Sequence, residues 1–91
     1  MFLYITLGTN DLAAARRFYD AVMPSLGLLR RAEDESEVGY GAPAPERIHL
    51  WVTHPYDKTP ATVGNGSMIA VPAATRTAVD AFHAAGLAAG G

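Results

Sequence analysis

Residues 2–27 read FLYITLGTNDLAAARRFYDAVMPSLG, and this stretch predicts a strand that leads directly into a helix. From Phe2 to Leu7 the side chains are β-branched, aromatic or aliphatic, which suits a pleated surface, and the turn-forming residues 8–10 end the run. Asn10 or Asp11 can accept hydrogen bonds from the free N–H groups of the following helix. The helix has one apolar stripe at helical spacing: Leu12, Ala15, Phe18 or Tyr19, Val22 and Leu26.

Two residues predict how this helix ends. Pro24 lacks a backbone N–H, which indicates a kinked or early-ending last turn. Gly27 suits the left-handed conformation that a helix C-cap prefers. The helix should therefore close at Gly27.

Three further strands are predicted before residue 54. Residues 28–32 and 38–42 flank a charged turn and resemble a hairpin, and residues 47–53 form a strand after a proline-rich turn at 43–45. Residues 54–66 hold two prolines and two glycines with little periodicity, which is typical of a linker.

The strand and helix then recur. Ser67 to Val71 is a second strand of the same kind, and Thr75 can cap a helix with the apolar face Ala78, Val79, Phe82 and Ala85. Ile5 and Ile69, like Phe18 and Phe82, lie 64 positions apart, so one module is used twice. We therefore expect an α+β protein of paired βαβββ modules. The first module spans 1–53 and the linker 54–66, and 67–91 hold only the strand and helix of a second module, which is incomplete in this chain.

Composition limits the functional classes. A chain of 91 residues forms one small domain, and 49% hydrophobic with 18% charged residues is typical of a soluble protein. The net charge of −2 gives no basic field for nucleic acid, and no apolar run reaches the roughly 18 residues of a membrane span. The absence of cysteine excludes disulfides and thiolate nucleophiles and is consistent with a cytoplasmic location.

The motifs at both ends of the chain resemble those of a known superfamily. TLGTNDL at 6–12 with RFYDAV at 17–22, and GNGSMIAV at 64–71 with VDAFH at 79–83 and the closing AAGG, look like the opening strand and helix of each module in vicinal oxygen chelate proteins. These include glyoxalases, bleomycin-resistance proteins and extradiol dioxygenases. The resemblance implies a glyoxalase-like fold, a small-molecule ligand and a homodimer.

Strand alternation indicates which residues face the cleft that the superfamily builds on its sheet. If Leu3, Ile5 and Leu7 pack on the helices, then Phe2, Tyr4 and Thr6 face the cleft. If Ile48, Leu50 and Val52 pack inward, then His49, Trp51 and Thr53 face it, and Met68 and Ala70 do so in the later strand.

Enzymes of this superfamily hold a divalent metal with His or Glu from the first and last strand of each module. The resemblance puts Tyr4, His49 and Met68 at three of these positions, with the fourth beyond Gly91. A thioether is a soft ligand, and a phenol with a pKa of about 10 ionises at a cost. Tyr4 and Met68 are therefore non-ligating types, and we predict no conventional metal site.

Two functional classes remain open. One is a glyoxalase-like lyase or a dioxygenase in which Tyr4 and His49 are catalytic, with an unusual metal set or with no metal. The other is a metal-free binding protein of the resistance type, whose ligand-binding residues would be Tyr4, Thr6, His49, Trp51 and Met68. Each of these side chains also has a purely structural interpretation. A ferredoxin-like sheet in a dimeric barrel, which has two strands between its helices, is the alternative fold.

Overall fold

The protein is described by a computed structural model that covers residues 3–42 and 47–91. Its elements in chain order are β1 (Ile5–Gly8), α1 (Leu12–Val22), the 3-10 helix η1 (Met23–Leu26), β2 (Leu29–Glu33), β3 (Glu37–Ala42), β4 (Arg47–Thr53) and α2 (Arg76–Ala88). Three strands lie between the two helices. This order confirms the βαβββ arrangement and contradicts the ferredoxin-like alternative.

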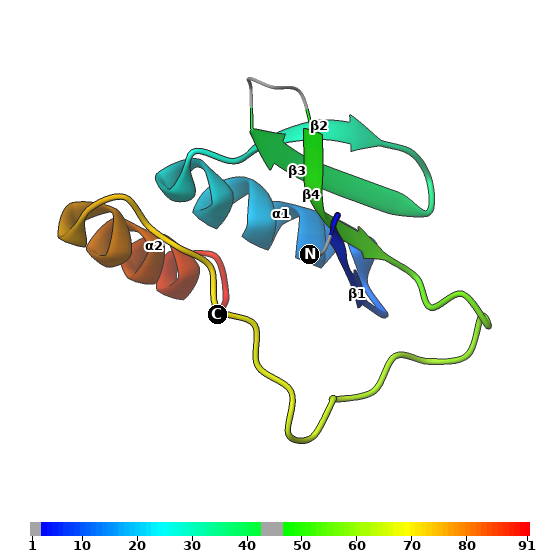
Figure 1. The fold of residues 1–91 in the computed structure, drawn as a ribbon. Helices are drawn as coiled ribbons and strands as arrows, with labels where there is room; N and C mark the ends of the chain where they lie inside the picture. The colour runs from blue at the N-terminus through cyan, green and yellow to red at the C-terminus, as the bar shows by residue number, and fades with distance from the viewer. Residues whose placement is uncertain (1–2, 43–46) are drawn as a thin grey trace.

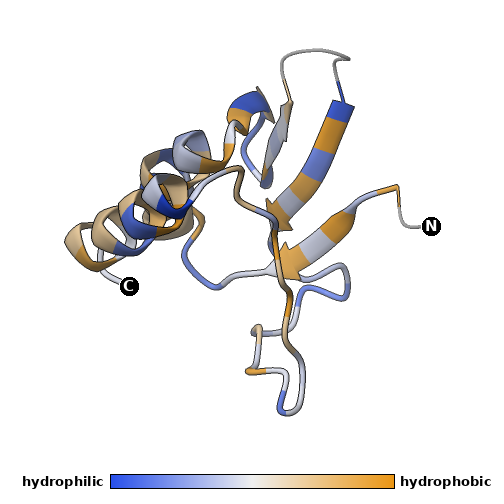
Figure 2. Cartoon of the chain, turned by 60° about the vertical axis from the view of Figure 1, so that its left-hand side comes forward, coloured by the Kyte–Doolittle hydropathy of each residue, from blue (hydrophilic) through white to orange (hydrophobic). Residues whose placement is uncertain are grey.

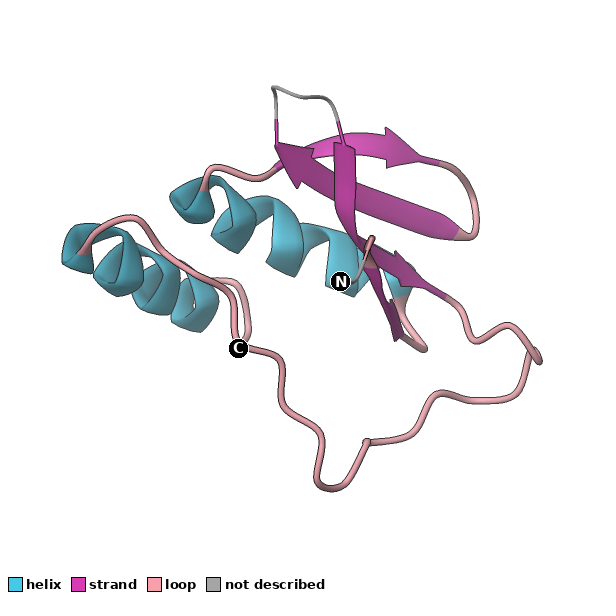
Figure 3. Ribbon diagram, in the orientation of Figure 1, coloured by secondary structure: helices cyan, strands magenta, loops and turns pink. Residues whose placement is uncertain are grey.

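The four strands form one sheet in the order β1-β4-β3-β2. After α1 and the β2–β3 hairpin the chain returns as β4, which runs parallel to β1. β4, β3 and β2 are antiparallel neighbours. α1 and α2 lie beside each other on the same side of this sheet (Figures 1 and 3). The other side of the sheet faces away from both helices.

The hydrophobic core lies between the sheet and α1. Val22, Val38, Tyr40 and Val52 are its fully buried side chains. Burial of an aliphatic side chain of this size contributes roughly 1.5–3 kcal/mol, so this layer is the main source of stability. Apolar and polar residues alternate along β4, as Figure 2 shows, and β3 contributes Val38 and Tyr40 to this layer.

The ends of both helices agree with the sequence. Asp11 Oδ1 accepts a hydrogen bond of 3.0 Å from the Ala14 N–H, and Thr75 Oγ1 accepts one of 3.1 Å from the Ala78 N–H. The two caps occupy equivalent positions of the internal repeat. α1 ends at Val22, and Pro24 lies in the 3-10 helix η1 that follows it. Gly27 ends η1 in the left-handed conformation, with a φ of 77°. These predictions are confirmed.

The strand predicted from Ser67 to Val71 is wrong, because the chain runs from β4 to α2 with no strand between them. A strand requires a hydrogen-bonded neighbour. In the first module that neighbour of β1 is β4, which follows the helix, and the described chain contains no strand after α2. The helix predicted after Thr75 is confirmed, while the division into two modules stays a prediction.

Two boundaries differ at the beginning of the chain. β1 begins at Ile5 and ends at Gly8, whereas we predicted a strand from Phe2 to Leu7. Phe2 and the turn predicted at 43–45 fall outside the described residues. Within the described ranges, neither helix is long and apolar enough to cross a membrane.

Candidate functional site

Thr6 and Trp51, two of the predicted ligand-binding residues, lie together on the side of the sheet away from the helices. In the β1–β4 pair Thr6 is opposite Trp51, and Leu7 is opposite the buried Val52. Successive residues of a strand point to opposite sides, so Thr6 and Trp51 face away from the core. We name this side the open face, which consists of Thr6, Gly39, Gly41, Ile48 and Trp51.

Trp51 lies across its neighbour in β3. Gly39 is paired with Trp51, and a Cβ atom at Gly39 would lie 2.8 Å from Trp51 Cζ3 and 2.9 Å from Ile48 Cγ2. The indole and the Ile48 side chain therefore occupy the space that a side chain at position 39 would take. This contact also places Ile48 on the open face, where we had not predicted it.

A β-bulge explains the different position of Ile48. The register between β3 and β4 runs from Tyr40 opposite Leu50 to Gly41 opposite Ile48, so His49 has no partner in β3. An extra residue of this kind reverses the alternation on one side of the bulge. His49 is the extra residue of the bulge, so regular alternation does not relate it to Trp51, and it lines a cavity together with Leu50.

His49 lines a cavity of about 460 Å³ on the helix side of the sheet. The cavity lies between the β1–β4 pair, the end of α1 with η1, and residues 69–72. Its walls are mainly aliphatic, and its hydrogen-bonding side chains are those of Tyr4, Tyr19 and His49. Burial raises the pKa of the Tyr19 phenol above its ordinary value.

Tyr4 and His49 both line this cavity, whereas Met68 does not. Tyr4 is 54% exposed at the rim of the cavity, whereas Met68 is 91% exposed and does not line it. The residues that follow Met68, from Ile69 to Pro72, form that wall instead. Without a strand at 67–71, nothing fixes the alternation that was expected to direct Met68 inward.

The donor set in this region does not fit a divalent metal. In residues 3–42 and 47–91 no three His, Asp or Glu side chains gather closely enough to share an ion. His49 is one imidazole beside a phenol, and a single neutral nitrogen does not hold a catalytic metal. The chemistry available to Tyr4 and His49 is hydrogen bonding and proton transfer.

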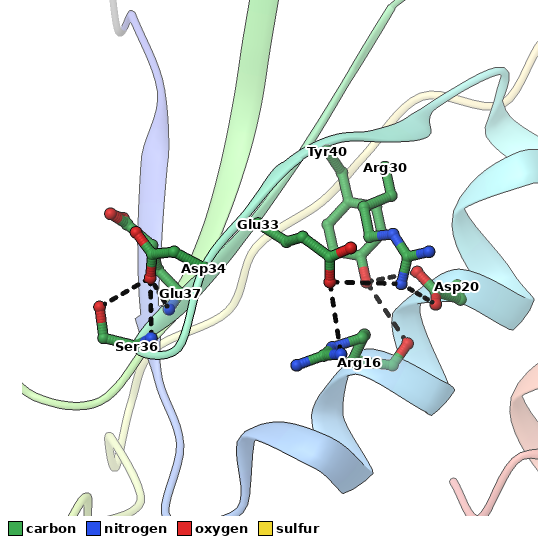
Figure 4. A network of polar contacts seen from close by, with 8 residues as sticks. All are labelled: Arg16, Asp20, Arg30, Glu33, Asp34, Ser36, Glu37 and Tyr40. Carbon is green, nitrogen blue, oxygen red and sulfur yellow. Dashed lines mark hydrogen bonds and ion pairs between the residues drawn. The ribbon is translucent and has the colours of Figure 1, made fainter.

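Arg16 and Arg30 take part in a polar network between α1 and β2. Arg30 Nη1 lies 2.9 Å from Asp20 Oδ2, and Arg16 Nη1 lies 3.3 Å from Glu33 Oε2 (Figure 4). Both ion pairs join the helix to the sheet.

Gly39 and Tyr19 belong to these two sites but were not predicted from the sequence. The sequence did contain an indication for Gly39, because Gly39 and Gly41 lie two positions apart in the strand 37–42. A glycine inside a strand often marks a position that another group approaches closely. Tyr19 was assigned only to the apolar stripe of the first helix. Its position at the cavity follows from how α1 packs against the sheet, which no local sequence pattern reveals.

The fold is matched by a protein of known structure. No family model matches the sequence, and no match was found among curated proteins. The crystal structure of a glyoxalase/bleomycin resistance protein from Albidiferax ferrireducens T118 superposes with a TM-score of 0.87. It is 39% identical, and the match covers 99% of this chain and 72% of that chain. At this identity and coverage, the chain belongs to the glyoxalase/bleomycin resistance family of the vicinal oxygen chelate superfamily.

Proposed function

We propose that this protein binds a flat, largely apolar small molecule on its open face, with Trp51 as the principal contact. The observation that carries this proposal is the position of the indole over Gly39, on the side of the sheet that faces away from both helices. An indole presents a large rigid surface to a flat ligand at little cost in side-chain entropy. Stacking on such a ring contributes about 1–3 kcal/mol in well-studied cases.

The surroundings of Trp51 define the ligand class. Ile48 adds an aliphatic surface beside the indole, and Thr6 brings a hydroxyl group that can donate or accept one hydrogen bond. None of the five residues of the open face is charged, and the charged residue that shares this side of β3 is Glu37, two positions before Gly39. These features favour a neutral aromatic or conjugated molecule with one polar group at its edge, held without a metal ion.

Calorimetric titration with a panel of bicyclic aromatic amides and alcohols tests this proposal. Trp51→Ala should weaken binding of the best panel member by about 1–3 kcal/mol. Trp51→Phe should recover part of the loss, because it keeps an aromatic surface. Tyr56→Ala is the matched control, since Tyr56 is a fully exposed aromatic residue of the linker. Equal affinities of the Trp51→Ala variant and the parent protein would contradict the proposal.

A second candidate function is supported by Tyr4 and His49, which line the same cavity. A phenol and an imidazole can exchange a proton with a bound substrate, as a metal-free lyase would require. We would test turnover of an adduct between a 2-oxoaldehyde and a thiol, the reaction class that the family name suggests. Activity lost in both Tyr4→Phe and His49→Asn, but kept in the exposed control His54→Asn, would support this function. No turnover by the parent protein would reject it.

We also propose that two copies associate through the outer edge of β1. Within the described chain β1 pairs only with β4, so its other edge has free main-chain groups. Leu3 beside this edge is 66% exposed. Light scattering should give twice the monomer mass, and Leu3→Lys should shift the protein toward monomer. A monomeric parent protein would contradict the association.

A further inference from the structure

We infer that Gly39 is a positioning residue that sets the pose of the Trp51 indole and thereby decides which flat ligands the open face accepts. This inference rests on the proposed function where it concerns ligands. Its first part, the pose of the indole, depends on the structure alone.

The backbone does not require glycine at position 39. The described glycines with positive φ are Gly27, Gly66 and Gly90, so Gly39 has a conformation that other residues adopt freely. Glycine inside a strand lowers stability relative to alanine because it loses more backbone freedom on folding. The reason for a glycine at position 39 is therefore the lack of room for a side chain, and not the backbone conformation.

The space is taken by the open-face side chains. A Cβ atom at Gly39 would lie 2.8 and 3.0 Å from two atoms in the benzene half of the Trp51 indole, and 2.9 Å from Ile48 Cγ2. Such distances are shorter than carbon atoms tolerate, so one group must move. Gly41 differs, because a Cβ atom there would collide with the Arg47 backbone carbonyl.

The strand cannot relieve this collision by shifting. Gly39 lies in β3, which has β2 on one side and β4 on the other. It is buried and paired with Ala32 and Trp51. The flanking Val38 and Tyr40 are fully buried in the core and fix β3 from the other side. The indole and the Ile48 side chain are both only partly buried, so these side chains move and the strand does not.

The pose of the indole determines the shape of the open face. With glycine at 39, the benzene half of the ring lies over the strand, and Ile48 is beside it. A methyl group at 39 would lift or rotate the ring away from the sheet and open a gap next to Ile48. A ligand that stacks on the present surface would then lose part of its contact area with the indole. Ligands of another shape would gain contact area.

Gly39→Ala tests the inference in two measurements. Without ligand, the near-ultraviolet circular dichroism and emission of Trp51, the single tryptophan, should change while the far-ultraviolet spectrum does not. With the panel of bicyclic aromatic amides and alcohols, affinity for the best member should fall about tenfold, and the rank order of the panel should change. In a Trp51→Leu background, Gly39→Ala should leave the remaining affinities unaltered.

The controls separate the possible outcomes. Gly86→Ala adds the same methyl group in α2, where its nearest neighbours are 3.7 Å away or more, and it should alter neither the Trp51 signals nor the panel. If Gly39→Ala does not fold, folding of Gly39→Ala/Trp51→Leu would support the inference, because the collision with the indole is gone and only the contact with Ile48 Cγ2 remains. Failure of this double variant to fold would overturn the inference, because Ile48 would then be the decisive neighbour. Unchanged Trp51 signals in folded Gly39→Ala would also overturn it. If the parent binds no panel member, the proposed function fails, but the Trp51 signals still decide the pose.

Discussion

The phenol of Tyr40 donates a hydrogen bond of 2.9 Å to Oδ1 of Asp20, which links the middle of β3 to α1. The other carboxylate oxygen of Asp20 accepts a hydrogen bond of 2.9 Å from Arg30 Nη1 (Figure 4). One carboxylate on the helix thus contacts two strands of the sheet. Because Tyr40 and Gly39 are neighbours in β3, this link also fixes the strand that supports the Trp51 indole.

We predict that Tyr40→Phe lowers the free energy of unfolding by about 1–2 kcal/mol, because it removes a hydrogen bond to a charged group and leaves the ring in place. The loss stays moderate since Asp20 keeps Arg30 as a partner. Urea denaturation measures it, with Tyr56→Phe at an exposed position as the control. A loss no larger than that of the control would show that the hydrogen bond is not formed in solution.

Tyr40 also predicts how stability changes in alkali. Burial, with the hydrogen bond and the charge of Asp20, raises the pKa of the Tyr40 phenol above its usual value of about 10. The unfolded chain therefore releases this proton first. Stability is fully present below pH of about 10 and falls above it, by up to about 1.4 kcal/mol per pH unit for this group. Urea midpoints between neutral pH and the alkaline range should decline less steeply in Tyr40→Phe than in the parent.

Gly86→Ala should stabilise the protein. Gly86 lies inside α2, where glycine is less favourable than alanine, and an added methyl group would contact Val22 and Phe18 at 3.7 and 3.8 Å. We expect a gain of about 0.5–1 kcal/mol in thermal or urea unfolding. Gly90→Ala is the contrasting variant, because Gly90 has a φ of 100° that alanine adopts only with strain. Destabilisation by Gly86→Ala would mean that the two helices pack more closely than described.

Asn10 should hold the linker to the beginning of α1. Its Nδ2 donates to the Ala61 carbonyl at 2.9 Å, and its Oδ1 accepts from the Ala61 N–H at 2.6 Å. Asn10→Ala removes both bonds, so exchange of the Ala61 amide proton should accelerate about tenfold or more. Asn65→Ala, at an exposed asparagine of the same linker, is the control. Unaltered exchange at Ala61 in Asn10→Ala would contradict the role.

Divalent metals should leave the stability unchanged. Tyr4 and His49 supply a single imidazole. Manganese, nickel or zinc in molar excess should therefore shift the thermal midpoint of the parent protein no more than that of His49→Ala. A tightly bound ion would instead raise the midpoint with the logarithm of its concentration. Such a rise in the parent protein, absent from His49→Ala, would contradict our account of the donor set.

Local rules predicted the elements that depend on neighbouring residues. The caps at Asp11 and Thr75, the turn at Gly27 and the strand from Arg47 to Thr53 each follow from side chains a few positions apart. The order of these elements, together with the motifs at both ends of the chain, was sufficient to predict the superfamily. The comparison with a solved structure confirms this prediction.

The failures concern pairing between distant segments. Residues 67–71 have the composition of a strand, but composition does not supply a hydrogen-bonded neighbour. The side of the sheet that His49 faces depends on how β3 and β4 align, and the bulge at this residue leaves no mark in the sequence of β4. The candidate site was therefore predicted as one group of residues, whereas the sheet divides it into two.

The bulge in β4 means that a change in length can alter the chemistry of a surface without altering any side chain. Insertion of one residue between Tyr40 and Gly41 in β3 would give His49 a partner, restore regular alternation and bring its imidazole to the same side as the indole. Relatives that differ by such an insertion would offer the same ligand a basic nitrogen in place of an aliphatic group. Sequence comparison across this family should therefore align the strand by its hydrogen-bonding partners before residue types are compared.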